Sequence, residues 1–359
     1  MHRLQLHYTL SRQASPAQVR NPLMDLLNAV STQGSISAGA RALGLSYRHV
    51  WGELKRWEAE LGNELIVWEK GQSAKLTEFG SKLMWAERQA QARLSPQIEA
   101  LRAELERAFA VAFDADAHVV TLHASHDDAL AALREQVRDP AALHLDIRFC
   151  GSVDAIRALN EGRCTLAGFH TLQNPQRGSL AEQVYKPLLK TGLHKIIGFA
   201  QRTQGLMVAQ GNPLRLHSLE DVASKNARFI NRALGSGTRL VLDELLQQAG
   251  IAAKQLQGYE QVESSHTAVA HAIASGQAQV GLGIEVAAQA QGLYFIPLVQ
   301  ENYHLVCLKT ALEQDAIVAL RNELKSAAWQ DKLRSLAGYT PAQCGEVLSL
   351  RAVLPWWSF

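Results

Sequence analysis

The sequence has 359 residues, which at about 150 residues per domain predicts two domains. Hydrophobic residues make up 47% of the chain and charged residues 19%, so packed cores can form and a mainly disordered or fibrous protein is excluded. Lysine and arginine number 36 against 34 acidic residues. The resulting formal charge of +2 predicts neither a nucleic-acid coat nor a membrane-binding surface, so any basic patch must be local.

The cysteine pattern and the hydropathy of the chain indicate its compartment. The four cysteines lie far apart without a CxxC pair, which argues against a disulfide scaffold and against a Cys-rich zinc site. The first eight residues lack the apolar core of a secretory signal, and no apolar run approaches the roughly 20 residues of a membrane span. We therefore expect a cytoplasmic protein with reduced thiols and no contact with a membrane.

The first 80 residues have the pattern of a winged helix-turn-helix. Alternation over residues 4–10 predicts a short strand. Apolar periodicity, serine caps and glycine stops then predict helices over 22–33, 38–43 and 47–61, and a Gly-containing turn between two helices is typical of a helix-turn-helix. Apolar segments at 65–68 and 74–77 flank a Gly-containing tip, which predicts a hairpin and makes the unit winged.

Residues 81–112 are helical in composition, with one predicted break at Ser95-Pro96. Around and beyond the break, apolar residues recur at intervals of four and three, as in a coiled-coil seam: Leu94, Ile98, Leu101, Leu105, Ala108 and Ala112. Such a seam favours a homodimer or a higher homo-oligomer. Packing of the helix against its own domain is the alternative.

From residue 118 the pattern becomes alternating strand and helix, which predicts a parallel sheet with right-handed crossovers. Strands are expected over 119–122, 145–149, 165–169, 194–199, 206–209, 228–231, 280–284 and 303–308. Helices are expected over 127–138, 153–161, 218–224, 238–249, 266–275 and 313–326.

The third helix carries two distinct faces. One face buries Val50 and Leu54, and the other presents polar and aromatic residues that can enter the major groove of DNA. Arg48 can pair with a guanine, while lysines and other arginines can contact phosphates. The predicted DNA-binding residues are Ser46, Tyr47, Arg48, Trp51, Lys55, Arg56, Lys70 and Lys75.

The charge of this module weakens the expectation of DNA binding. Residues 21–80 hold six basic and seven acidic residues, a formal charge of −1, so the charges must be segregated for DNA to bind. A small helical bundle that contacts a protein partner is the alternative. The stretches 34–51, 56–62 and 76–80 nevertheless resemble the winged helix of ModE-type molybdate-responsive regulators, which are relatives of the LysR-type family. The resemblance covers about residues 21–90 and implies that Tyr47, Arg48 and Trp51 lie on the recognition helix.

The second part of the chain contains several turns that suit an anion. The turn Gly235-Ser236-Gly237-Thr238 follows a strand and opens a helix, where free N–H groups and the helix dipole favour negative charge. Similar junctions occur at 124–126, 151–153 and 264–267, and the carboxyl ends of strands converge on one crevice. Arg232 or Arg239 can add a cation. Asp127 or Asp128 can act as acceptors for a protonated phosphate, so the selectivity stays open.

Residues 118–340 also resemble the periplasmic-binding-protein-like domain, often of the molybdate-binding type, that bacteria attach to this winged helix. The similarity rests on 124–127, 167–170, 202–206, 231–239 and 280–284. It implies a ligand site made of Ser125, Ser152, Arg232, Ser236, Gly237, Thr238 and His266.

Metal and enzyme chemistry find little support. His123, His126, His170 and His266 form no HxH or HExxH pattern, and neither a GxSxG elbow nor a complete GxGxxG fingerprint occurs. We therefore expect no metal, no cofactor and no catalytic residues, in a protein that is not an enzyme.

Together these patterns predict an α+β winged helix-turn-helix domain (1–80), a linker helix (81–113), a two-lobed α/β periplasmic-binding-protein-like (type II) effector domain (117–340) and a C-terminal tail (341–359). The predicted function is one-component transcription regulation on a double-stranded inverted-repeat operator, controlled by a small oxyanion, with molybdate or tungstate as the first choice. One alternative keeps the architecture but senses formate, sulfate or a molybdenum-cofactor fragment. The other is a cytoplasmic oxyanion carrier without DNA function.

Overall fold

A computed structural model describes residues 21–67, 74–113, 118–137 and 143–357. The chain forms two compact units, Met1–Ser95 and Pro96–Phe359, and each is described by itself. One helix, α4 (Glu78–Phe113), contributes residues to both units. Among the described helices, none combines the length and the apolar character that crossing a bilayer requires.

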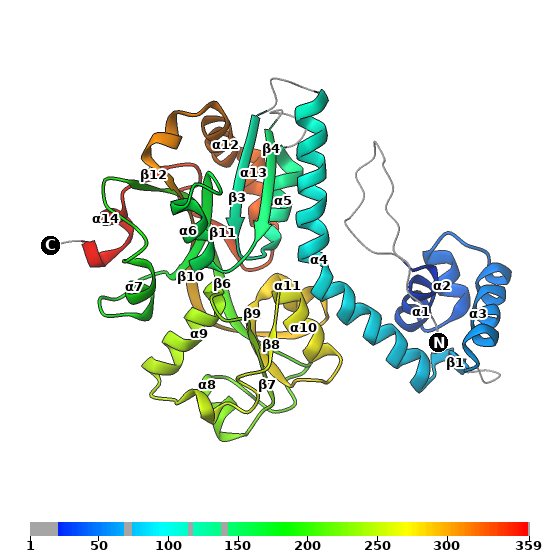
Figure 1. Cartoon of the computed structure of the whole chain (residues 1–359). Coiled ribbons are helices and arrows are strands. Elements are labelled where there is room, and N and C mark those ends of the chain that lie inside the picture. Colours follow the sequence, from blue (N-terminus) through cyan, green and yellow to red (C-terminus); the bar gives the residue numbers. More distant parts are fainter. Residues whose placement is uncertain (1–20, 68–73, 114–117, 138–142, 358–359) are drawn as a thin grey trace. The chain divides into compact units, whose positions relative to one another are not determined.

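Unit 1 contains α1 (Pro22–Gln33), α2 (Ile36–Ala42), α3 (Tyr47–Leu61) and a hairpin of β1 (Ile66–Val67) and β2 (Lys75–Leu76) (Figure 1). The hydroxyl of Ser46 caps α3 by accepting from His49 N at 3.2 Å, and Gly62 closes this helix in the left-handed conformation. The predicted helices and hairpin are therefore confirmed, with α2 starting two residues earlier than expected. The strand predicted at 4–10 lies outside the described residues.

The core of unit 1 lies between α1 and α3, and α2 packs closely against α1. Leu27, Val30, Val50 and Leu54 are almost fully buried between α1 and α3. A Cβ atom added at Gly39 of α2 would lie 3.1 Å from backbone atoms of α1, so only glycine fits there without displacing α1.

The predicted break at Ser95-Pro96 is wrong. α4 continues through Pro96 as one helix, although proline has no N–H to donate and costs about 3 kcal/mol in a helix interior. Ser-Pro is a frequent start of a helix, but the residues on both sides here favour helix strongly enough to continue it. The boundary between the two units falls at this point.

Unit 2 has two lobes, which pack helices on a ten-stranded sheet (Figure 1). Lobe 1 contains β3 (His118–Ala124), α5 (Asp128–Val137), β4 (Leu143–Phe149), α6 (Ser152–Asn160), β5 (Leu166–Leu172) and α7 (Leu180–Tyr185). Lobe 2 contains α8 (Leu219–Ser224), β7 (Phe229–Arg232), α9 (Gly237–Gln248), η1 (Ala253–Gln255), β8 (Val262–Glu263), α10 (His266–Ala274), β9 (Val280–Ile284) and α11 (Glu285–Ala290).

Two long strands join the lobes, β6 (His194–Val208) and β10 (Tyr294–Leu308). They pair antiparallel from His194↔Leu308 to Tyr294↔Val208. β10 continues into lobe 1 by pairing with β5, and β6 continues into lobe 2 by pairing with β9. Because β6 and β10 run antiparallel to their neighbours, the sheet is mixed and the prediction of a parallel sheet holds only within each lobe. The two strands predicted at 194–199 and 206–209 are one strand, β6.

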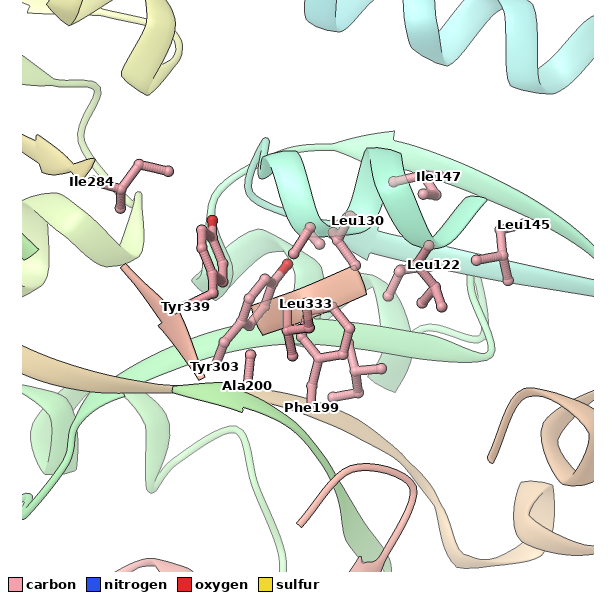
Figure 2. Packing of buried hydrophobic residues seen from close by; sticks show 14 of the residues in the cluster. Leu122, Leu130, Leu145, Ile147, Phe199, Ala200, Ile284, Tyr303, Leu333 and Tyr339 are labelled. Atoms are coloured by element: carbon pink, nitrogen blue, oxygen red, sulfur yellow. The ribbon is translucent and has the colours of Figure 1, made fainter. Parts of the chain in front are cut away.

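The chain returns to lobe 1 and ends there. The last elements are η2 (Lys309–Glu313), α12 (Asp315–Lys325), α13 (Ala327–Arg334), β11 (Tyr339–Pro341), β12 (Val347–Leu348), α14 (Leu350–Val353) and η3 (Pro355–Trp357). β11 and β12 both pair with β6. Leu354 and Trp356 are buried, so the segment expected as a tail packs into unit 2. Figure 2 shows part of the largest core, which includes Tyr303 and Tyr339.

Candidate functional site

Unit 1 presents an exposed aromatic and basic surface at the start of α3. Tyr47 is 50% exposed and stacks on Trp51 with 6.3 Å between ring centroids. Lys55 Nζ lies 4.9 Å from the centre of the Trp51 ring. Arg48 is also exposed, whereas Val50 and Leu54 face the core at 1% exposure. The two predicted faces of the helix are therefore separate.

The predicted DNA-binding residues differ in their existing partners. Lys55 pairs at 2.6 Å with Glu58, whose side chain is only 9% exposed. Arg56 pairs at 2.6 Å with Glu53 on the helix surface. A surface pair like the second contributes about 0.2–1 kcal/mol, so a phosphate can replace the Glu53 carboxylate. The Ser46 hydroxyl caps α3. Among the described residues, the side chains of Arg48 and Lys75 have no hydrogen-bond or ion-pair partner, and Lys70 lies outside the described part of the chain.

In lobe 2, three chain turns meet where β7 ends and α9 and α10 begin. Ser236 caps α9 by accepting from Arg239 N at 3.3 Å, so that Gly237 and Thr238 form the first turn of this helix. The Thr238 hydroxyl lies 3.3 Å from Nε2 of His266, the first residue of α10. Arg232, the last residue of β7, is 3% exposed.

Lobe 1 approaches this region closely. Ser152 at the start of α6 has its Oγ 3.4 Å from His170 Nδ1 on β5. A Cβ atom added at Gly237 would lie 2.7 Å from that same His170 Nδ1. A Cβ atom at Gly151 would lie 2.5 Å from the Gly235 carbonyl oxygen. The turns after β4 and β7, which the sequence assigns to one crevice, therefore touch across the two lobes.

Several buried polar groups in this region lack a hydrogen-bond partner among the described residues. They are Arg232 Nε and Nη1, Ser125 Oγ, His170 Nε2, His266 Nδ1 and Tyr303 Oη. An unsatisfied buried donor or acceptor costs about 1–3 kcal/mol, so such an accumulation indicates that a ligand completes the set. Of the predicted ligand residues, Ser125 is buried after β3 and makes no side-chain hydrogen bond to the others.

Arg239, the alternative cation, has partners of its own. Its Nε lies 3.3 Å from both carboxylate oxygens of Asp243, and its guanidinium lies 3.9 Å from the centre of the Tyr259 ring. Arg232 is therefore the arginine of this turn with nitrogen atoms left to bind a ligand.

The electrostatics of the site favour negative charge. Burial, and then the charge of Arg202, lower the pKa of Arg232 to about 9. Burial also lowers the pKa of His170 and of His266 well below the usual value, and both Arg202 and Arg232 add to this effect. The two imidazole rings are therefore neutral at pH 7 and lie in a positive potential.

The strands between the lobes carry a buried polar cluster that sequence reasoning missed as site residues. Arg202 on β6 forms ion pairs with Asp127 and with Glu301 on β10, and all three are at most 1% exposed. The Gln204 amide donates to Glu301 Oε1 and to Thr238 Oγ1, both at 3.0 Å. Gln204 Oε1 and Glu301 Oε2 have no partner among the described residues. Arg202 and Gln204 lie in mid-strand, within the stretch 202–206 that contributed to the family resemblance, but the sequence analysis did not assign them to the ligand site.

Asp127, one of the two carboxylates expected to accept a hydrogen bond from a protonated phosphate, belongs to this cluster. Asp127 Oδ1 accepts from Ala129 N at 2.8 Å, and Oδ2 accepts from Arg202 and, at 2.8 Å, from the Tyr339 hydroxyl. Asp127 therefore fixes Arg202 and has no oxygen without a partner.

Two further features of unit 2 lie away from this cluster. His126 points to Glu99 of α4 at 3.6 Å and packs on Phe149, and the described residues contain no group of three or more metal-binding side chains. A separate pocket of about 250 Å³ on lobe 1 is lined by Thr121, His123, Asp146, Arg148 and Arg163. Its two arginines are largely exposed and Arg163 pairs with Glu161, so we do not assign a ligand to it.

Comparisons with known proteins match both units. Residues 23–81 match the family model of the bacterial regulatory helix-turn-helix protein, lysR family. Residues 132–325, more than half of the chain, match the family model of the PBP superfamily domain.

Two relatives have no described activity. YvgK of Bacillus subtilis is 31% identical over 56% of this chain, which spans 64% of the length of YvgK. A Clostridium pasteurianum protein from the region 5′ of a ferredoxin gene is 31% identical over 31% of this chain and 98% of its own length.

Solved structures show distant similarity. A mutant of Corynebacterium glutamicum OxyR aligns with 87% of this chain and 95% of its own, at 18% identity and a TM-score of 0.41. A phosphate-bound substrate-binding protein from Clostridium perfringens covers 62% of this chain and 99% of its own, at 14% identity and a TM-score of 0.48.

The two family models account for the helix-turn-helix of unit 1 and for the two lobes of unit 2 in the order expected from the sequence. Members of the lysR family regulate transcription and are not enzymes, in agreement with the expectation that this chain is not an enzyme. The chain therefore belongs to the PBP superfamily through residues 132–325, and a helix-turn-helix of the bacterial regulatory lysR type precedes this domain at residues 23–81.

Proposed function

We propose that this protein is a one-component transcription regulator whose PBP domain senses a small oxyanion, with molybdate or tungstate as the first choice. The observation that carries the proposal is the buried guanidinium of Arg232, whose Nε and Nη1 have no partner among the described residues. The carboxylates of Asp127 and Glu263 lie near enough to act on this charge, but burial of unpaired guanidinium nitrogen atoms is unfavourable, and a bound oxyanion supplies the missing hydrogen-bond acceptors.

The type of anion follows from the groups that remain available. Both oxygens of Asp127 are occupied, and Arg232, the hydroxyls and the amides at the start of α9 are donors. A dianion that carries no proton at pH 7, such as molybdate or tungstate, needs only donors. We choose molybdate or tungstate among such dianions because the winged helix resembles that of ModE-type molybdate-responsive regulators.

A second candidate is favoured by a specific observation. Gln204 Oε1 and Glu301 Oε2 are buried acceptors without partners among the described residues, and a protonated anion such as hydrogenphosphate can donate to them. Calorimetric titration of the full chain at pH 7 with molybdate, tungstate, sulfate, phosphate and formate separates the cases. We expect molybdate or tungstate to bind most tightly. Preference for phosphate selects the second candidate, and the absence of heat with every anion refutes an oxyanion sensor.

Control of transcription requires that the anion changes DNA affinity. We propose that a dimer of winged helices binds an inverted repeat and that the anion prefers one arrangement of the lobes, with a coupling of about 1–3 kcal/mol or 5–150-fold in affinity. Selection of genomic fragments and footprinting with and without molybdate test this step. Protection of no sequence at low salt favours the carrier alternative.

The side chain of Arg232 provides a direct test of the site. Arg232→Gln should weaken molybdate binding about 10- to 150-fold, because hydrogen bonds to a charged group contribute about 1.5–3 kcal/mol. Calorimetry measures the change, and circular dichroism verifies that the variant is folded. Arg239→Gln is the matched control, since Arg239 lies on the same turn but already pairs with Asp243. Equal losses in the two variants would contradict the assignment.

The pKa of Arg232 predicts how binding depends on pH. Because this pKa is lowered to about 9, the free protein loses the Arg232 charge as the pH rises through 9. The anion binds the protonated form, so its association constant should be nearly constant from pH 7 to 8 and fall by up to about tenfold per pH unit above 9. Molybdate stays a dianion throughout. Calorimetry from pH 7 to 10 measures the profile, and a constant affinity up to pH 10 would contradict the lowered pKa of Arg232.

Two substitutions should affect DNA binding in different ways. Arg48→Ala should cost about 1–3 kcal/mol on the preferred operator and relax base preference, since we propose that this arginine reads bases. Lys75→Ala should weaken all sequences alike and lower the slope of log affinity against log salt by about one, as expected for a phosphate contact. Fluorescence anisotropy at several salt concentrations distinguishes them. Identical behaviour of the two variants would contradict the assignment of α3 as the reading helix.

The expected dimer has a matching surface on α4. Within unit 2, Leu101 is 58% exposed and Leu105 and Phe109 are 37% and 41% exposed, four residues apart. We propose that a second copy covers this row. The double change Leu101→Glu, Leu105→Glu should produce monomers in sedimentation analysis. Val318→Glu, at an apolar position on α12 that is as exposed as Leu105, should leave the dimer intact. A dimer that persists in the double variant refutes this interface.

A further inference from the structure

A chain of buried hydrogen bonds leads from the strands between the lobes to the imidazole of His266. It starts at Glu301 on β10, whose Oε1 accepts from Arg202 Nε and, at 3.0 Å, from Gln204 Nε2. Gln204 Nε2 also donates to Thr238 Oγ1 at 3.0 Å, and this oxygen lies 3.3 Å from His266 Nε2. No member is more than 3% exposed, so water does not replace these contacts.

The direction of each hydrogen bond follows from the first one. The Gln204 amide must present its NH₂ group to Glu301, since the reverse orientation would place two oxygen atoms against each other. The Thr238 hydroxyl therefore accepts from Gln204 and must donate its own proton elsewhere. Among the described residues, the acceptor within hydrogen-bond distance of this hydroxyl is His266 Nε2.

A ring nitrogen that accepts a hydrogen bond carries no proton, so the proton of a neutral imidazole lies on the other nitrogen. In His266 that atom is Nδ1, which is buried and has no partner among the described residues. A Cβ atom added at Gly283 would lie 3.4 Å from Nδ1 and 2.4 Å from the methyl carbon of Met207, so glycine here makes room for the Met207 side chain beside this edge of the ring.

We propose that Gln204 and Glu301 are positioning residues that hold His266 in the Nδ1-protonated tautomer, so that His266 offers the ligand a hydrogen-bond donor and no acceptor. This inference rests on the proposed oxyanion site and deepens it. A donor at Nδ1 favours an unprotonated oxygen of the ligand and disfavours a ligand hydroxyl at the same point. Selectivity for a fully deprotonated anion would then originate on the strands between the lobes, and Gln204 and Glu301 need not touch the ligand.

The tautomer can be measured without any anion. The full chain is labelled with ¹⁵N-histidine, and long-range ¹H–¹⁵N spectra at pH 7 report which ring nitrogen is protonated; His266→Gln identifies the signal. We expect a protonated Nδ1 and an unprotonated Nε2 in the natural sequence. A protonated Nε2 or a charged ring refutes the proposal.

Variants then test the role of this series of hydrogen bonds. Gln204→Met should shift His266 toward the Nε2-protonated tautomer and weaken molybdate binding about tenfold, and Thr238→Val should cause the same shift if the first variant does not fold. Gln201→Met is the matched control: Gln201 also lies on β6 but donates to Asn302 at 3.0 Å, so neither quantity should change. An unchanged tautomer in both Gln204→Met and Thr238→Val refutes the positioning role.

The two proposals fail in different ways. The Nδ1 tautomer without binding of molybdate or phosphate would refute the oxyanion site and leave the assignment of the tautomer intact. Molybdate binding with the Nε2 tautomer would refute this inference alone.

Discussion

The effector unit is organised around the buried guanidinium of Arg202. It joins Asp127, in the turn after β3, to Glu301 on β10, and Tyr339 of β11 completes the coordination of Asp127. Removing one partner from such a buried pair costs about 3–5 kcal/mol because a charge remains uncompensated. The ion pair between Arg202 and Glu301 lies at directly opposed positions of the two long strands, where the chain passes between the lobes, and the turns of the candidate site are positioned around this point.

The charges of the site follow from this arrangement. Because Asp127 and Glu301 are paired with Arg202, Arg232 is left as the cation with unpartnered nitrogen atoms. The DNA-binding unit has a similar division. Although residues 21–80 have a formal charge of −1, Glu53 and Glu58 pair with neighbours on α3, and Glu58 also accepts from the amides that begin β1. Arg48 and Lys75 keep their charges available, which is how an acidic module can present a basic surface.

Much of the fold could be predicted from the sequence because the signals are local. Serine caps, glycine stops and apolar periodicity mark α1, α3, α9 and α10 almost to the residue. The turn around Ser236 could be predicted for the same reason, since a Gly-Ser-Gly-Thr sequence after a strand is typical of the start of a helix. Helix continuation through Pro96 could not, because it depends on the flanking turns.

The polar cluster was hidden for a different reason. Residues 201–205 of β6 interrupt an apolar pattern, and a polar stretch between two apolar runs normally indicates a loop. Here the polar side chains are buried against partners that lie about 75 to 100 residues away in the sequence, as with Arg202 and its two carboxylates. Such pairing is decided by tertiary structure, and a single sequence gives no sign of it.

The two lobes meet at Gly151 and Gly235 through backbone atoms alone. There the main chain of one lobe rests on the main chain of the other, with no room for even a methyl group. Because neither Gly151 nor Gly235 carries a charge or a rotatable side chain, changes in salt concentration or pH do not directly change the distance between the lobes at this contact. The limit to the approach of the lobes is thus steric, and under the proposed function the bonds of a bound anion would decide how long this arrangement lasts.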